Sequence, residues 1–310
     1  MKKLFPMLVV LAVFLSACQL GGGQAAQPTQ IVLPDAVATF TPVTAGESQS
    51  NAKAGSERTS SADGMVQVYI PAGTFTMGGV DPKASSDEKP AHRVTMKDFW
   101  MDKVEVTNGM YALCVKAGTC RLPVDFKSQT RSSYYGNAEY NDFPVVYVTW
   151  LEAKTYCEWS GGRLPTEAEW ERAARGDDTR TYPWGDQVPN ASWANFSNLI
   201  GDTTKVGSSP AGASPFGIFD MAGNVAEWVN DFYDPKYYAS GLSANPSGPG
   251  GRTRFFNHVV RGGTFQDVEA DIRVSKRASV LGSNPDALID SVEWLGTYSP
   301  KIGFRCVSDN

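Results

Sequence analysis

The segment from Val148 to Gly176 constrains the fold of this 310-residue chain more than any other, because it carries two helix-start signals close together. Thr149 and Glu152 have the Thr-x-x-Glu spacing of a capping box, in which hydroxyl and carboxylate satisfy free backbone N–H groups. Thr166 and Glu169 repeat this spacing. A Gly-Gly pair between the two signals can end the first helix. The sequence therefore predicts two short helices joined by a sharp corner and packed on a sheet.

The start of the chain has the organisation of a bacterial export signal. Two lysines precede an apolar run from Leu4 to Leu15, which is well short of the roughly 20 apolar residues of a membrane-spanning helix. A Leu-Ser-Ala-Cys sequence then ends at Cys18 and matches a lipobox. We predict a lipoprotein signal peptide over residues 1–17 and a lipid anchor on Cys18, on the extracytoplasmic side of a bacterial cell membrane or on the cell surface. The alternative is an ordinary secretory signal with an incidental cysteine.

Composition divides the rest of the chain into two parts. Residues 18–63 are rich in Gly, Ala, Gln, Ser, Thr and Pro and have too few large apolar side chains for a core, so we predict a disordered tether. Residues 64–308 are predicted to form one domain. The net charge of −5 and the lack of a basic stripe argue against a nucleic-acid-binding protein.

Local patterns predict further elements of this domain. Met65–Ile70 alternates like a strand, and Gly73–Gly78 has the pattern of its hairpin partner. Thr107 is the predicted cap of a helix that runs to about Lys116. Further strands are expected at Arg93–Met101, His258–Arg261 and Gly303–Val307.

Several motifs resemble the formylglycine-generating enzyme family, also called the sulfatase-modifying factors. They occur in the family's order from about residue 64 to 307. The resemblance implies a compact α+β domain with a C-type-lectin-like fold, low secondary-structure content and many loops. The motifs are Met77-Gly78, Glu88-x-Pro90-x-His92, Glu105–Asn108, Trp150, Cys157-x-Trp159, Gly162–Glu171, Ala173–Gly176, Tyr182-Pro183-Trp184-Gly185, Gly217–Trp228, Arg261-Gly262-Gly263-Thr264 and Gly303–Cys306.

Four cysteines remain when Cys18 is set aside, and an even number in an exported domain permits two disulfides with three possible pairings. Cys114 and Cys120 flank a predicted helix end and can pair locally. The resemblance implies that Cys157 and Cys306 form the family's structural disulfide. The alternative is four buried, reduced thiols.

The resemblance also shows what this chain lacks. In the catalytic members of the family that this chain resembles, two copper-binding cysteines follow an Arg-Gly-Gly-Ser segment. These members convert a sulfatase cysteine into formylglycine. Here those positions fall near Asp267 and Ile272. Neither side chain can replace a thiolate ligand of cuprous ion, so we expect no copper and assign no catalytic residue. A related branch uses iron held by three histidines, which a chain with two histidines excludes.

Structural calcium is the one cofactor that the resemblance implies. One set of ligands maps to the side chains of Asp220 and Glu227 with the carbonyls of Gly223 and Val225. Hard oxygens of this kind are what calcium prefers. A second set is predicted from Asn195, the carbonyl of Phe196, and one of Asn198, Ile200 or Asp202.

We therefore interpret the chain as an anchored, non-catalytic binding module. Its membrane contact is the lipid anchor, and its ligand is expected to be an extracellular glycan or peptide. The alternative is a formylglycine-generating oxidase, an accessory factor acting on sulfatases, or an enzyme with an unrecognised site, including an acid–base pair from Asp267, Glu269 and Asp271. The predicted ligand surface consists of Thr264, Phe265, Asp267, Asp271 and Arg273.

Overall fold

The structure is a computed structural model, and it describes residues 52–241, 243–249, 257–282 and 296–309. The predicted signal peptide and the anchor at Cys18 lie outside these residues. The described residues belong to one compact unit, Ser48–Asn310. No helix in this part of the chain is long and apolar enough to cross a membrane.

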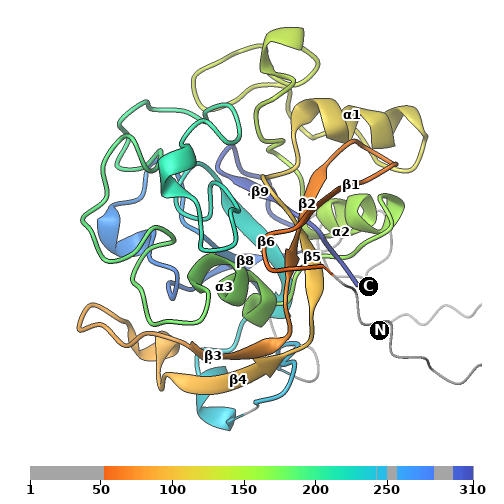
Figure 1. The fold of residues 1–310 in the computed structure, drawn as a ribbon. Helices are drawn as coiled ribbons and strands as arrows, with labels where there is room; N and C mark the ends of the chain where they lie inside the picture. The colour runs from red at the N-terminus through yellow and green to blue at the C-terminus, as the bar shows by residue number, and fades with distance from the viewer. Residues whose placement is uncertain (1–51, 242, 250–256, 283–295, 310) are drawn as a thin grey trace, which may run out of the picture. The chain divides into compact units, whose positions relative to one another are not determined.

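A four-stranded antiparallel sheet brings both ends of the domain together (Figure 1). Its strand order is β1-β2-β5-β10, so the last strand lies beside a strand from the first third of the chain. The strands are β1 (Glu57–Thr59), β2 (Val66–Ile70), β5 (Phe99–Asp102) and β10 (Val307–Ser308).

The first strand corrects the predicted boundary between tether and domain. Residues 57–59 fall within the predicted tether, 18–63, but they pair with β2 in the register Glu57↔Val68. The backbone N–H of Tyr69 also donates to the carbonyl of Ser56. Composition does not reveal this edge strand, because backbone pairing rather than apolar side chains holds it in place.

The predicted hairpin between β2 and β3 (Gly73–Met77) is wrong. β3 pairs instead with β4 (His92–Met96) in a separate two-stranded sheet. The residues between β2 and β3 are Pro71 and Ala72, and tight hairpin turns need positive φ, which proline cannot adopt. The predicted single strand over 93–101 is therefore divided between β4 and β5, which belong to different sheets.

The remaining four strands form a mixed sheet with the order β8-β7-β6-β9, in which only the β6–β9 pair is parallel. The strand predicted near His258 is β7, and the last predicted strand is divided into β9 and β10, which lie in different sheets. The strands are β6 (Ala226–Phe232), β7 (Asn257–Arg261), β8 (Ala278–Leu281) and β9 (Ile302–Phe304).

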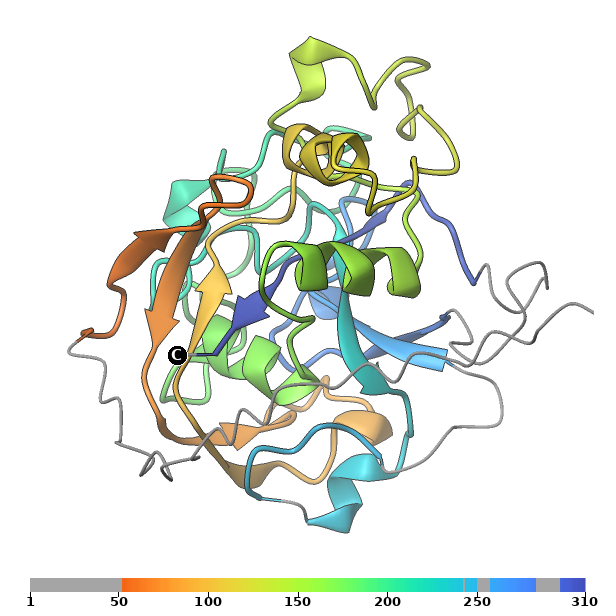
Figure 2. The same ribbon diagram turned by 90° about the vertical axis from the view of Figure 1, so that its right-hand side faces the viewer.

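The three predicted helices are confirmed, together with their caps. Thr107 caps α1 (Asn108–Lys116), and capping boxes begin α2 (Trp150–Trp159) and α3 (Glu167–Arg175) at Thr149 and Thr166. α1 packs against α2, and α2 packs against β6 (Figure 2). Every residue of α3 is buried, including the charged ones, so this helix lies inside the domain rather than on its surface.

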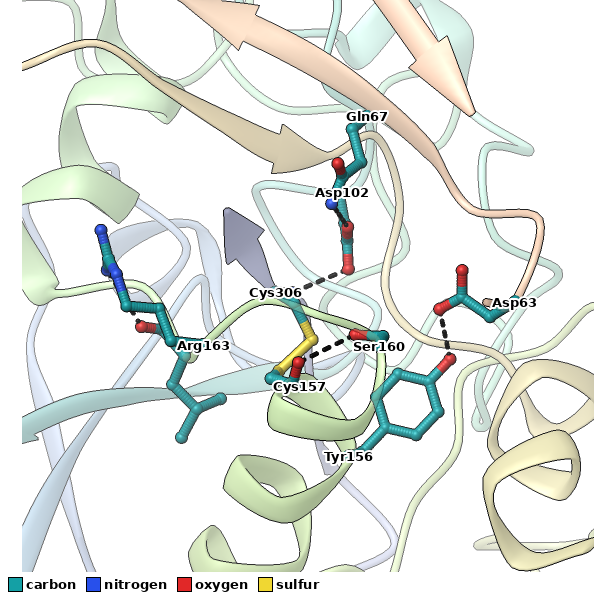
Figure 3. The surroundings of a disulfide bond; sticks show 9 residues. Asp63, Gln67, Asp102, Tyr156, Cys157, Ser160, Arg163 and Cys306 are labelled. Atoms are coloured by element: carbon teal, nitrogen blue, oxygen red, sulfur yellow. Dashed lines mark hydrogen bonds between the residues drawn. A yellow bond between two sulfur atoms is a disulfide. The ribbon is translucent and has the colours of Figure 1, made fainter. Parts of the chain in front are cut away.

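Both predicted disulfides are present. One disulfide joins Cys114 and Cys120, which lie six positions apart at the end of α1. The other joins Cys157 and Cys306, which lie 149 positions apart. Figure 3 shows the long-range bridge between the end of α2 and the C-terminal segment. Asp102 accepts the backbone N–H of Cys306 at 2.8 Å, which fixes this segment beside β5. The α+β fold with many loops that the resemblance implies is confirmed.

Candidate ligand-binding site

The segment that replaces the family's cysteine region is a tight turn after β7. Gly262 and Gly263 follow the strand with φ values of 89° and 71°, a region that favours glycine. A Cβ on Gly263 would lie 2.8 Å from the carbonyl oxygen of Asp271, so a larger residue would push the turn apart. Asp267 closes the turn, because its Oδ2 accepts the backbone N–H of Thr264 at 2.8 Å.

A cavity of about 320 Å³ lies beside this turn. One wall is apolar and comes from the mixed sheet. The rim carries groups of positive and of negative charge. Lys276 Nζ lies 2.9 Å from Asp271 Oδ1, and Lys301 donates to Gln266 at 3.2 Å. The lining residues are Ala226, Val260, Gly263, Thr264, Asp267, Asp271, Lys276, Ala278, Val280, Ser299, Lys301 and Ile302.

Three of the five predicted ligand-surface residues, Thr264, Asp267 and Asp271, line this cavity. The other two predictions, Phe265 and Arg273, are wrong because both side chains point into the protein. Phe265 is completely buried, and Arg273 is 1% exposed. Ile272, at the second expected cysteine position, is also completely buried and packs in an apolar cluster with Tyr182, Ala194, Phe196 and Ala222.

Arg273 is held by an acid that lies 185 residues earlier in the chain. Its guanidinium makes two hydrogen bonds of 2.8 Å to the Glu88 carboxylate, and Asp81 lies 3.0 Å away. Burial opposes the charge on Glu88, but Arg273 and Ser275 hold its pKa below the ordinary value. This pair anchors the end of the pocket turn to the loop that contains Glu88.

A second buried network joins the turn to α3. Arg277 makes hydrogen bonds of 2.7 and 3.0 Å to Glu167, and Arg261 contacts both Glu167 and Glu171. Burial opposes ionisation of Glu167, yet Arg277 and Arg261 hold its pKa below the ordinary value. The beginning and end of the pocket turn are thus attached to the same rigid helix.

Sequence reasoning missed the apolar wall and the two lysines of the cavity. Lys276 and Lys301 stand alone in loops, and no spacing or motif connects them with the Asp271 region. The apolar wall collects single residues from β6, β7 and β9 and two alternating residues from β8, and the sequence does not show which strand face borders a cavity. Glu269 is not among the residues that line the cavity and pairs with Lys83 at 2.8 Å, so it does not join Asp267 and Asp271 as an acid–base group.

The first predicted set of calcium ligands does not fit the ion as the residues stand. Both oxygens of Glu227 accept hydrogen bonds from Arg305, and Trp170 donates to one of them at 2.8 Å. The charge of Glu227 is thus balanced inside the protein. Burial raises the pKa of Asp220 and of the neighbouring Glu105, which disfavours a second charge at this place.

In the second predicted set of calcium ligands, Asn195 is the residue that fits the ion. Asn195 is buried, and its Oδ1 has no hydrogen-bond partner in the described part of the chain, while its Nδ2 donates to the carbonyl of Asp202. An orphaned amide oxygen is a suitable calcium ligand. The Asp202 carboxylate is engaged elsewhere, because it accepts hydrogen bonds from Ser128 and Thr130. Asn198 is exposed, with a positive φ of 57°.

The fold and the site define a class of protein. Residues 50–310 match the family profile of the sulfatase-modifying factor enzyme 1-like domain, and the chain belongs to this family. The solved structure of PvdO from Pseudomonas aeruginosa is similar, with a TM-score of 0.69 and 26% identity over 84% of this chain and 100% of that one. Treponema denticola variable protein 1 shares the fold, with a TM-score of 0.64 at 19% identity over 82% of this chain and 99% of that one.

Particular relatives carry different names. The serine/threonine-protein kinase pkn1 of Chlamydia pneumoniae is 36% identical over 255 residues, 78% of this chain and 38% of that protein. The chain thus spans well under half the length of that relative. The formylglycine-generating enzyme of Streptomyces coelicolor is 30% identical over 293 residues, 78% of this chain and 89% of that protein. A bovine relative is named an inactive Cα-formylglycine-generating enzyme 2, at 31% identity over 294 residues, 78% of this chain and 87% of that protein.

Proposed function

We propose that this chain is a non-catalytic, ligand-binding member of the family. The observation that carries the proposal is the state of its cysteines. All four cysteines among the described residues are used in two disulfides, and the residues expected at the reactive positions are Asp267 and Ile272. Oxidation of a substrate cysteine by the family's route needs a pair of thiolates to hold copper, and no such pair is available in this domain.

The cavity beside the turn supports a peptide as the ligand. Its apolar wall can bury one aliphatic side chain, and its rim presents carboxylates and ammonium groups that match the two charges of a peptide. Ala278 and Val280 of this wall belong to β8, a strand that ends the order of the mixed sheet. An extended peptide can add main-chain hydrogen bonds along such an edge.

The proposal places this domain outside the cytoplasm. Cys18 ends a lipobox pattern, and residues 19–51 between it and the described domain are polar and rich in small residues. A lipid anchor on Cys18 would keep the domain at the membrane, where it can meet extracellular ligands.

The binding half is tested with the full chain on a random peptide array. Asp271→Ala with Lys301→Ala removes one acid and one base from the rim and should abolish the array signals. Asp142→Ala with Lys205→Ala is the matched control, because it removes an exposed ion pair whose side chains are 65% and 60% exposed. Equal signals from both double variants would contradict the proposed site.

The non-catalytic half is tested by aldehyde formation on a peptide that contains Cys-x-Pro-x-Arg, with copper and oxygen supplied. We expect no product from the wild-type chain, while the Streptomyces coelicolor relative serves as a positive control. Copper-dependent turnover by this chain would overturn the proposal and support the alternative of an oxidase.

A further inference from the structure

Three aromatic rings form a ladder in the loop after α3. The rings of Tyr182 and Trp184 are stacked with an interplanar angle of 5° and centroids 5.2 Å apart. Trp193 continues the series at a tilt, with an interplanar angle of 39° and its centroid 5.5 Å from that of Trp184. Tyr182 is buried, but both tryptophans are partly exposed. The binding cavity described above does not use this ladder.

The loop holds the ladder rigidly. The backbone N–H of Tyr182 donates to the carbonyl of Gly185, and the N–H of Gly185 donates back to the carbonyl of Tyr182. The indole N–H of Trp184 donates to the carbonyl of Gln187 at 3.1 Å. A preformed aromatic surface of this kind loses little conformational entropy when a ligand binds.

A second cavity of about 210 Å³ opens beside the first ring of the ladder. Its lining includes Tyr182, Asp186 and Val188 from the loop of the ladder, together with Lys83 and Glu269. Lys83 and Glu269 are paired at 2.8 Å. The cavity lies beside the short helix η5 (Glu269–Asp271), whose last residue lines the first cavity, so the two cavities border opposite ends of this one helix.

Polar groups around the ladder remain available to a ligand. Asp186 accepts the backbone N–H of Thr181 through Oδ1, but its Oδ2 accepts no hydrogen bond from the described part of the chain. The indole N–H of Trp193 likewise has no acceptor within the described ranges. One acceptor with a negative charge and one neutral donor thus belong to the same loop as the two partly exposed indole rings.

We propose that the ladder and this second cavity form a saccharide-binding subsite. The face of an aromatic ring carries negative partial charge, and the C–H groups on one face of a pyranose carry positive partial charge, so the two surfaces attract. Sugar hydroxyls supply the donors that Asp186 needs and the acceptor that Trp193 needs.

The charges around the cavity define the class of sugar further. Lys83 pairs with Glu269, and the buried Arg273 pairs with Glu88 and lies 3.0 Å from Asp81, so Asp186 is the lining carboxylate without an ion-pair partner in the described part of the chain. The subsite therefore favours neutral or amino sugars and disfavours uronic acids, because an acidic sugar meets like charge.

The test is calorimetric titration of the full chain with three probes: cellohexaose, a hexamer of glucosamine, and hexagalacturonate. We expect at least one of the first two to bind with Kd below about 1 mM, and hexagalacturonate to bind at least about tenfold more weakly. Trp193→Ala and Asp186→Asn should each lower the affinity for the sugar about tenfold. Trp159→Ala is the control, because Trp159 is also partly exposed but lies at the end of α2.

Asp186→Asn keeps the shape of the side chain, so its result holds even if Trp193→Ala lowers the stability of the loop. Absence of binding by all three probes, or equal affinity of the Trp193, Asp186 and Trp159 variants, would overturn the subsite. The rim variant Asp271→Ala with Lys301→Ala should keep sugar affinity, so failure of the peptide proposal remains distinguishable from failure of this one.

Discussion

Arg261 Nη2 lies 2.6 Å from Glu171 Oε2, and both side chains are completely buried. Arg261 also donates to the carbonyls of Val274 and Ser275 at 2.6 and 3.1 Å. One guanidinium therefore connects α3, the end of β7 and the segment that follows the pocket turn. Its place in the Arg-Gly-Gly-Thr motif has a structural explanation, since this arginine ties the start of the turn to α3.

Glu171→Gln should destabilise the domain by about 3–5 kcal/mol, because it removes the charge that two buried guanidinium groups share: Arg261 keeps only its longer contact of 3.3 Å to Glu167, and Arg175 loses its contact of 3.3 Å to Glu171. Urea denaturation measures the effect. Glu158→Gln is the control: its pair with Lys154 lies on the exposed surface of α2, and the expected change is within about 0.5 kcal/mol. Similar small changes in both variants would contradict a central role for the buried pair.

The two disulfides should differ in their contributions to stability. In the chain-entropy model, the bridge between Cys157 and Cys306 contributes about 5 kcal/mol, and the short bridge between Cys114 and Cys120 about 2 kcal/mol. The double variants Cys157→Ser/Cys306→Ser and Cys114→Ser/Cys120→Ser test this by thermal and urea unfolding. A larger loss from the short bridge would show that local packing, rather than loop closure, determines the cost.

Local signals predicted the helices well, because a capping box involves residues only three positions apart. The disulfide between Cys157 and Cys306 was predicted only through the family resemblance, since pairing over 149 residues leaves no local pattern. The predictions failed where a partner lies far along the chain. Arg273 was assigned to the surface because its partner, Glu88, is 185 residues away, and β1 was missed because only its pairing with β2 makes it a strand.

Anchoring is predicted to depend on Cys18. Cys18→Ala should abolish palmitate labelling and release the protein from the membrane fraction, because a lipid chain attached at this residue is the expected anchor. Cys120→Ser should keep the label and serves as the control. Membrane retention of the Cys18 variant without label would contradict the lipoprotein prediction.

Calcium is predicted to bind at Asn195 and to stabilise the fold. An ion that binds only the native state adds RT ln(1 + [L]/Kd), about 2.7 kcal/mol at a hundred times Kd, so a chelator should lower the Tm. Asn195→Ala should remove this response. Glu227→Gln should lower the Tm but keep the response, because Glu227 is paired with Arg305. Identical melting curves of the wild type with and without chelator would contradict the calcium prediction.

His258 makes stability dependent on pH. Its ring is completely buried between Trp150 and Phe232, with centroids 3.9 and 4.3 Å away, and Nδ1 lies 3.2 Å from the carbonyl oxygen of Asn230. Nε2 has no partner within the described residues. Burial lowers the pKa of His258 from 6.5 to about 4, because the charged ring would lose its hydration.

The neutral ring is therefore favoured in the folded state, and the unfolded chain binds the proton first as the pH falls below 6.5. Stability should be constant with respect to this group above pH 7 and should fall by about 3 kcal/mol between pH 6.5 and 4. His258→Phe cannot bind this proton. The free energy of unfolding of the wild type minus that of the variant should therefore fall as the pH is lowered through that window and remain constant from pH 7 to 9. Urea denaturation of both proteins at each pH measures the difference, and a difference that does not change with pH would show that His258 is accessible to protons in the folded domain.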